Sequence, residues 1–322
     1  MSGLEQARRW AWAPVRLAGT MHRSGMKALE HDCLNVAQAT AYSAIVTLFP
    51  GLIIAAALVS VLPFSMPLRI QLAIFFDRIL PPTVSPMLDT YFQTMHRTPQ
   101  TTRAMVGSML VSVFGATSVM ATLMEGFRRA YELPDGMGVW LLRKRALLLV
   151  PLSMVPFAVA SAIVVFGNLF TLWLTRHVDA VISGPVLLMS VVLRWSVAVS
   201  GCIGILAVVY HMGTPMERSN VKEPGTQPWR EVIPGASVAT AMWFVATITF
   251  GWYVTRFANY SQVYGSLGAG IALMIWLYIV ALCVLFGAEF NAQLFLRKNA
   301  GGGGETVEIP SKMAEADRKT AG

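Results

Sequence analysis

Charged residues are scarce in this sequence. Only 13% of its 322 residues are Asp, Glu, Lys or Arg, whereas 55% are hydrophobic, and the mean hydropathy is +0.57. A water-soluble chain needs about 25% charged residues to cover its surface. The shortage argues against a soluble two-domain protein and predicts that much of the surface faces lipid.

Cysteine and histidine are sparse as well. The three cysteines, Cys33, Cys202 and Cys283, show no CxxC spacing, so they provide neither a disulfide framework nor a zinc site. The five histidines are scattered, and His31-Asp32 stands as an isolated pair. Metal-dependent RNA hydrolysis needs His and Asp ligands at short spacing. We therefore expect a protein that is not an enzyme, with no metal and no cofactor.

Targeting and nucleotide-binding motifs are also missing. Residues 1–34 lack the early apolar core of a cleavable signal peptide, and no P-loop occurs. The net charge is +8 and the pI about 9.7. Because the basic residues lie between apolar runs, they indicate contact with anionic lipid headgroups and control of topology. We expect membrane lipids as partners and no nucleic acid.

Long apolar runs are what the sequence has in abundance. A bilayer core about 30 Å thick requires about 20 helical residues. Six segments reach that length, which predicts an all-α membrane protein with six transmembrane helices. The predicted spans are residues 36–62, 104–123, 146–174, 185–210, 235–257 and 266–294.

The distribution of Lys and Arg predicts the orientation. With both termini in the cytoplasm, 18 of these residues lie on the cytoplasmic side and six on the other, as the positive-inside rule requires. The expected organisation is a cytoplasmic amino-terminal segment, a six-helix domain and a disordered cytoplasmic tail. These parts cover residues 1–34, 35–297 and 298–322.

The first extracytoplasmic loop, residues 63–103, is too long for a simple connection. Leu68, Leu72, Phe75 and Ile79 recur at helical spacing, with Arg and Asp on other faces. This predicts an amphipathic helical segment. It would lie in the outer interface, or form part of a packed lid over the bundle.

Polar residues within the spans are candidates for function, because they are costly in a membrane. Arg194 lies deep in the fourth span, and Asn168 in the third span is its candidate partner at similar depth. Two interpretations stay open for Arg194. It snorkels or caps a carbonyl as a structural device, or it contacts a headgroup or substrate.

A second polar layer is expected at the cytoplasmic ends of the spans. It forms either interhelical hydrogen bonds or a gate and site for an anionic headgroup. Arg128 and Arg129 follow Glu125 at i+3 and i+4, so local ion pairing is predicted. The members of this layer are Gln38, Tyr42, Glu125, Arg128, Arg129, Glu289 and Asn291.

Proline and small residues mark places where helices bend or approach each other. Pro50 interrupts the first span, and Pro151 and Pro156 the third, so kinks are expected there. The segment from Tyr264 to Gly270 repeats small residues four apart, which predicts close helix packing. An unwound entry beside a substrate path is the alternative.

Three stretches together resemble the YihY/BrkB family of bacterial inner-membrane proteins. The first is ATAYSAIVTLFP at 39–50, and the second is GFRRAY at 126–131. The third and most specific comprises WREVIPG at 229–235, YGSLGA at 264–269, WLY at 276–278 and GAEFNA at 287–292. The resemblance covers residues 30–297. It implies an inner-membrane location, with leads toward virulence, serum resistance and envelope lipid precursors.

Two functions are carried forward. The first is a non-enzymatic protein that moves or accommodates a lipid or lipid-linked envelope precursor, suggested by the kinked spans and two polar layers. The second is a scaffold that recruits envelope proteins through its outer loop and basic cytoplasmic loops. The family has also been labelled ribonuclease BN-like, a label that the scattered histidines do not support.

Overall fold

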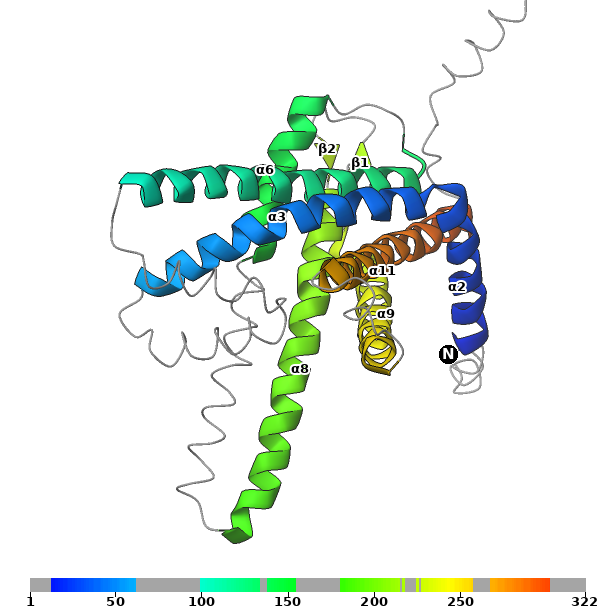
Figure 1. The fold of residues 1–322 in the computed structure, drawn as a ribbon. Helices are drawn as coiled ribbons and strands as arrows, with labels where there is room; N and C mark the ends of the chain where they lie inside the picture. The colour runs from blue at the N-terminus through cyan, green and yellow to red at the C-terminus, as the bar shows by residue number, and fades with distance from the viewer. Residues whose placement is uncertain are drawn as a thin grey trace, which may run out of the picture.

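The computed structural model describes residues 13–61, 99–133, 138–154, 180–214, 216–217, 224–225, 227–256 and 267–301. Within these ranges the chain is helical apart from short turns and one minimal antiparallel ribbon. The helices are α2 (Ala13–Glu30), α3 (Cys33–Val61), α6 (Pro99–Ala130), α8 (Ala180–Gly213), α9 (Trp229–Arg256) and α11 (Leu267–Gly301), and residues 139–154 are helical too. The ribbon pairs β1 (Met216–Glu217) with β2 (Pro224–Gly225). Figure 1 shows their arrangement.

Four of the described helices are long and apolar enough to cross a membrane. They are Val106–Ala130, Val191–Gly213, Trp229–Val254 and Gly270–Arg297, which confirms a multi-pass helical membrane protein. The first predicted span is the helix α3, in which Cys33–Leu48 is an apolar stretch of shorter length. The third is described only over 139–154. The count of six spans and the amphipathic segment in loop 63–103 stay predictions, because residues 62–98 and 155–179 lie outside the described ranges.

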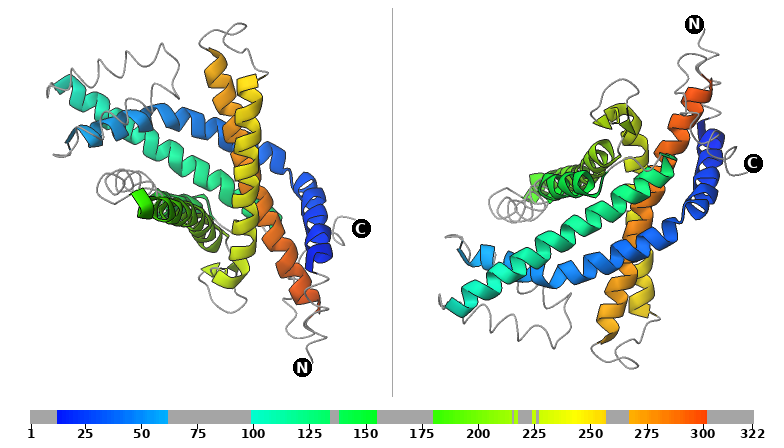
Figure 2. Two further views of the ribbon diagram at one scale, coloured as in Figure 1. Left: turned by 90° about the horizontal axis from the view of Figure 1, so that it is seen from below. Right: turned by 90° about the horizontal axis from the view of Figure 1, so that it is seen from above.

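The buried hydrophobic side chains gather mainly at one end of the helices, called here the packed end. There Phe127 meets Tyr210 edge to face, with ring centroids 5.2 Å apart, and the Tyr210 hydroxyl donates to the Val284 carbonyl over 2.6 Å. Away from this end, α3 with α6, α9 with α11, and α8 leave in three directions (Figures 1 and 2). The packed end comprises residues 33–41, 123–131, 207–214, 232–240 and 281–293.

Close approach of α9 and α11 depends on one glycine from each helix. A Cβ atom added at Gly235 would collide with the Gly287 carbonyl oxygen, and one added at Gly287 would lie 2.6 Å from the Gly235 carbonyl oxygen. The close packing predicted for the segment from Tyr264 to Gly270 stays a prediction, because residues 257–266 lie outside the described ranges. No described atom lies within 4 Å of a Cβ built at Gly270, and the close approach that the described residues show is at Gly287, later in the same helix.

The proline predictions have mixed outcomes. Helix α3 continues through Pro50 without a break, and Figure 1 shows its axis curving along its length. Pro151 also lies inside a helix, whereas Pro156 is outside the described residues. Pro234, which was not predicted to interrupt a helix, lies in the second turn of α9, where it removes one backbone hydrogen bond.

Candidate functional site

Helix α2 is the element that the sequence did not predict, since residues 1–34 were assigned only as a polar segment. It packs along the end of α11 with small polar side chains, and Thr20 and Ser24 are buried. Arg297 of α11 donates to the Thr20 hydroxyl over 3.0 Å. Ser24 bonds back to the carbonyl of Thr20 at 2.9 Å, which satisfies its hydroxyl inside the contact. The α2–α11 contact therefore fixes the residues that follow α2.

The chain turns sharply at Asp32, between α2 and α3 (Figure 1). Asp32 has a φ of 57°, the left-handed conformation that often ends a helix. Its N–H donates to the Leu29 carbonyl and its carbonyl accepts from Val36, so one residue ends α2 and begins α3. This turn brings His31 and Cys33 against the end of α11.

Replacing Asp32 with glycine is expected to raise the free energy of unfolding by about 1 kcal/mol, because a left-handed conformation costs a side chain roughly that much. The ion pair lost with Arg129 is long, at 3.7 Å, and exposed, so its loss matters little. Unfolding in mixed micelles, followed by circular dichroism, measures the change.

Glu30→Gly is the matched control, since Glu30 is the last residue of α2 and a helical glycine costs about 1 kcal/mol. Equal losses of stability in both variants would show that the left-handed turn at Asp32 carries no strain.

Glu289 lies at the centre of the packed end with a side chain that is 0% exposed. His31 Nδ1 is 2.7 Å from Glu289 Oε1, and the Cys33 thiol donates to the same oxygen over 3.7 Å. No described residue bonds the second oxygen, Oε2. Among the residues that the structure describes, no group of three His, Cys, Asp or Glu side chains could hold a metal ion. The arrangement is thus a buried carboxylate with an imidazole as its partner.

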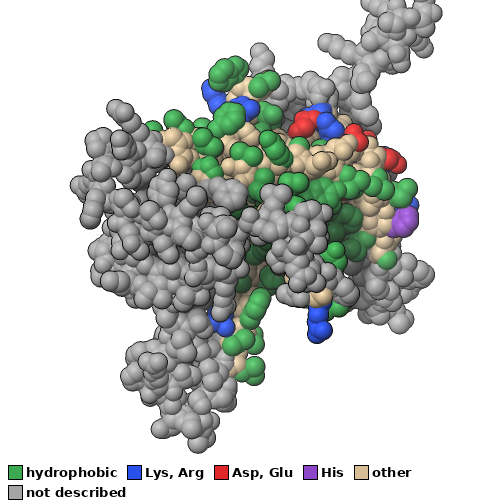
Figure 3. Space-filling view, in the orientation of Figure 1, with side chains coloured by type: hydrophobic (Ala, Val, Ile, Leu, Met, Phe, Trp, Pro, Cys, Tyr) green, Lys and Arg blue, Asp and Glu red, His purple; other side chains and the backbone are tan. Residues whose placement is uncertain are grey.

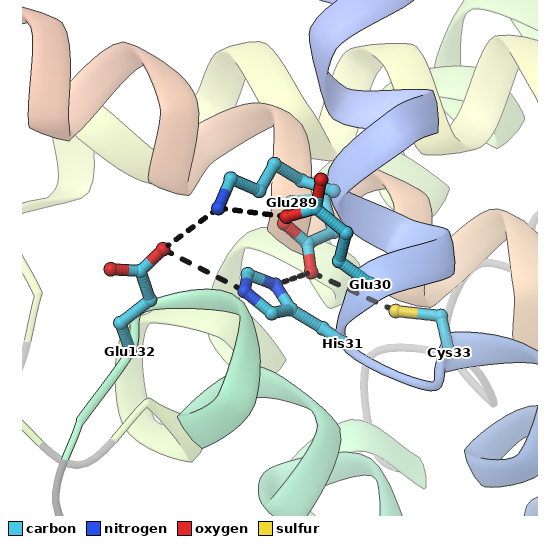
Figure 4. A network of polar contacts seen from close by, with 6 residues as sticks. Glu30, His31, Cys33, Glu132 and Glu289 are labelled. Carbon is cyan, nitrogen blue, oxygen red and sulfur yellow. Dashed lines mark hydrogen bonds and ion pairs between the residues drawn. The ribbon is translucent and has the colours of Figure 1, made fainter.

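The other ring nitrogen of His31 faces the surface of the molecule. His31 Nε2 lies 3.7 Å from Glu132 Oε1, and Lys27 Nζ lies 3.3 Å from the same oxygen. Lys27 also pairs with Glu30 at 3.0 Å, and hydrogen bonds to Glu30 and then Glu132 raise the pKa of Lys27. Figure 4 shows His31 between the buried Glu289 and the half-exposed Glu132. The name Glu289 site is used here for Glu289 with His31, Cys33, Lys27 and Glu132.

The local ion pairing predicted at the end of α6 is confirmed. Glu125 accepts from Arg128 at 2.7 and 2.9 Å and from Arg129 at 3.1 Å. Arg128 also donates to the Leu133 carbonyl over 2.7 Å, which fastens the turn that carries Glu132. In Figure 3 the acidic side chains visible on this face lie together where α2, α3 and the end of α6 meet.

A separate set of polar contacts lies where α6, α8 and the start of α9 meet at the packed end. The Gln227 amide donates to the Tyr131 hydroxyl over 2.5 Å, and burial raises the pKa of Tyr131. His211 bonds the Gln227 carbonyl and stacks on Trp229, with ring centroids 4.1 Å apart. These contacts join α6, α8 and the start of α9 and indicate a structural role.

The predicted inner layer does not form one site. Glu289 faces α2 and α3, whereas Asn291, two residues later, faces α9 and bonds Gly235 N and Val232 O. Gln38 and Tyr42 are exposed, Tyr42 by 66%. They do not join Glu289, because they lie on another face of α3.

The predicted outer layer is untested. Arg194 is half-buried in α8, and Asn168, its predicted partner, lies outside the described residues. Tyr264 also lies outside them.

His31, Cys33, Lys27 and Glu132 were missed as site residues, and describing His31-Asp32 as an isolated pair was wrong. His31 pairs with a residue 258 positions away. One pattern could have indicated it. Thr20, Ser24, Lys27 and His31 lie four, three and four apart, which places them along one face of a helix. That face is polar, so a search for apolar faces passes over it.

Known proteins resemble this chain over most of its length. The family model described as "Virulence factor BrkB" matches residues 26–308. The Bacillus subtilis (strain 168) protein YfkH, named a ribonuclease-like protein, is 26% identical over 286 residues, covering 87% of this chain and 93% of that protein. A UPF0761 membrane protein of Chromohalobacter salexigens is 26% identical over 84% of this chain and 62% of its own length.

A second UPF0761 membrane protein, from Tolumonas auensis, is 44% identical over 66 residues, 20% of this chain and 22% of that protein. No solved structure matches the chain. The family model spans α3 to α11 and includes all five residues of the Glu289 site. The chain therefore belongs to the BrkB family of membrane proteins, as the motifs in α3, α6, α9 and α11 predicted.

Proposed function

We propose that this protein is a non-enzymatic carrier of the bacterial inner membrane that moves or accommodates an amphiphilic envelope molecule, a lipid or lipid-linked precursor. The observation that carries the proposal is the buried Glu289, placed inside an apolar helix with His31 as its hydrogen-bond partner. Ionisable residues within membrane spans are expensive and generally mark transport paths or relays.

The surroundings of Glu289 support the same function. The surplus of Lys and Arg around the packed end supports a cytoplasmic location for that end and for both termini. Toward the other end, large apolar side chains are exposed, among them Leu110, Phe114 and Ile248, as lipid contact requires. In this proposal the packed end is the cytoplasmic end, and the Glu289 site lies within it, where a gate would act.

Replacing Glu289 with glutamine is expected to reduce lipid movement at least about tenfold, since one membrane-buried carboxylate often decides transport. The measurement uses vesicles of phosphatidylethanolamine and phosphatidylglycerol with a trace of headgroup-labelled lipid. Chemical quenching of the label in the outer leaflet follows the exchange between leaflets. The glutamine keeps the shape of the side chain and removes only its charge.

Glu30→Gln provides the control, because Glu30 is 58% exposed and pairs only with Lys27 among the described residues. It should move lipid at the wild-type rate. If wild-type vesicles exchange lipid no faster than protein-free vesicles, or if Glu289→Gln equals wild type, the proposed function fails.

A further inference from the structure

The imidazole of His31 joins two carboxylates in very different surroundings. Its Nδ1 touches Glu289, which is 0% exposed, and its Nε2 faces Glu132, which is 52% exposed. The ring itself is 14% exposed. A histidine with a carboxylate at each nitrogen can take a proton on one side and release one on the other. Between Glu289 and the surface, this is the one ring that the described residues provide.

We infer that Glu289 is a proton-binding site loaded from the packed-end surface through Glu132 and His31. As the site of a coupling ion, this inference rests on the proposed function, because the bound proton would then drive or gate movement of the amphiphile. As a proton-binding site it stands on the geometry alone.

The transfer conserves protons at each atom. Neutral His31 begins with its proton on Nδ1, donated to the carboxylate of Glu289. The protonated carboxyl of Glu132 gives its proton to Nε2 as the Nδ1 proton passes to Glu289 Oε1. One proton has then moved from the surface to the buried carboxylate, and the imidazole is neutral with its proton on Nε2. The gap of 3.7 Å to Glu132 is closed by a small side-chain movement or one water.

Neighbouring charges on α2 and α3 leave this path open. Lys27 is held by Glu30 and Glu132, at 3.0 and 3.3 Å, so it does not neutralise Glu289 by direct contact. Asp32 lies on the other side of the turn and pairs with Arg129. Cys33 contributes only a weak thiol donor to Oε1. Among described residues, His31 is thus the main hydrogen-bond partner of Glu289.

The charged and titratable groups on α6 and α9 interact with residues other than Glu289. Arg129 pairs with Glu125 and Asp32. Tyr131 is bound to Gln227, and the charge of Glu231 on α9 acts on Tyr131. Because none of these groups makes an ion pair with Glu289, protonation is the way in which its charge can be removed.

The unpartnered Oε2 of Glu289 gives a second, independent indication. A buried carboxylate oxygen without a hydrogen bond costs free energy, and structural carboxylates are normally satisfied on both oxygens. Here one oxygen has two donors and the other has none among the described residues. A carboxyl that alternates between ionised and protonated states fits this imbalance better than a permanent ion pair does.

Infrared spectroscopy of the purified protein in lipid nanodiscs tests the inference without any transport assay. A pH titration should show a protonated-carboxyl stretching band that is absent from Glu289→Gln. After a rapid pH jump, His31→Asn should slow the change in this band about a hundredfold, the contribution expected of a positioned proton-transfer group. Asparagine can still donate to Oε1 but cannot relay a proton.

Two surface variants test the inference even if His31→Asn fails to fold. Glu132→Gln and Glu30→Gln each remove one carboxylate partner of Lys27, and only Glu132 contacts His31. Glu132→Gln should slow the change of the carboxyl band after the pH jump. Glu30→Gln should leave the rate of this change as it is in the wild type. A titration in which Glu289→Gln removes no band, or in which both surface variants match wild type, overturns the inference.

The two proposals fail separately. If the infrared band of the Glu289 carboxyl titrates but the protein exchanges no lipid, the proton-binding site is supported and the proposed function is rejected. Lipid exchange that ignores an imposed pH gradient, in protein without a titrating Glu289 band, rejects the proton site and leaves the proposed function in place.

Discussion

Gly287→Ala should lower the free energy of unfolding by about 3 kcal/mol, the upper range for overpacking a tight contact. The new Cβ atom would lie 2.6 Å from the Gly235 carbonyl oxygen and 2.7 Å from the Ala239 Cβ, and it would also collide with the Tyr210 hydroxyl. Two of these three neighbours are backbone or a Cβ atom, which cannot turn away. The helices α9 and α11 would have to separate, and the hydrogen bond from Tyr210 to Val284 would be strained with them.

Gly251 of α9 and Gly270 of α11 supply matched controls, since no described atom lies within 4 Å of a Cβ at either position. Alanine there should be neutral or stabilising, because glycine is a poor helix former. Gly235→Ala should resemble Gly287→Ala, and the double variant should cost less than the two single losses together, since both atoms disturb one crossing. Unfolding in mixed micelles with sodium dodecyl sulfate provides the comparison. Equal stability of Gly287→Ala and Gly270→Ala would show that the helices do not cross at these glycines.

Apolar runs made the helices predictable. The spans predicted at 185–210, 235–257 and 266–294 are the helices α8, α9 and α11, each longer than its apolar run by a few residues. The extra turns at the start of α9 and the end of α11 contain charged residues and lie at the packed end, where α11 continues through Arg297 to Gly301. Helix α8 is longer at both ends. Hydropathy locates the part of a helix that lies in lipid, and it contains no information on turns stabilised by contacts beyond it.

Contacts between distant segments were not predictable in the same way. Spacing within α6 predicted that Glu125 pairs with Arg128 and Arg129, because residues three and four apart on a helix are neighbours. No local rule places His31 beside Glu289. Their contact depends on α2 packing against α11 and on the left-handed turn at Asp32. Small residues four apart near Gly270 were equally ambiguous, because spacing permits close approach without showing which face meets a partner.

The second large effect is expected at Asn291. Its amide oxygen accepts from Gly235 N over 2.7 Å, and its amide nitrogen donates to the Val232 carbonyl over 3.0 Å. Both backbone groups flank Pro234, which has no N–H of its own. The side chain is 1% exposed, so water cannot replace these bonds. Asn291→Leu should therefore lower the free energy of unfolding by about 3 kcal/mol, the cost of leaving buried polar groups unsatisfied.

Gln293→Leu is the control for Asn291→Leu. Gln293 is also a buried amide near the end of α11, and no hydrogen bond joins its side chain to another described residue. Its replacement should change stability by less than about 1 kcal/mol, because only burial of an apolar side chain changes. Since Asn291 faces α9 and Glu289 faces α2 and α3, Asn291→Leu in protein that still folds should leave the Glu289 carboxyl band in place. Loss of that band with folding intact would mean that the two residues form one site after all, as the sequence had suggested.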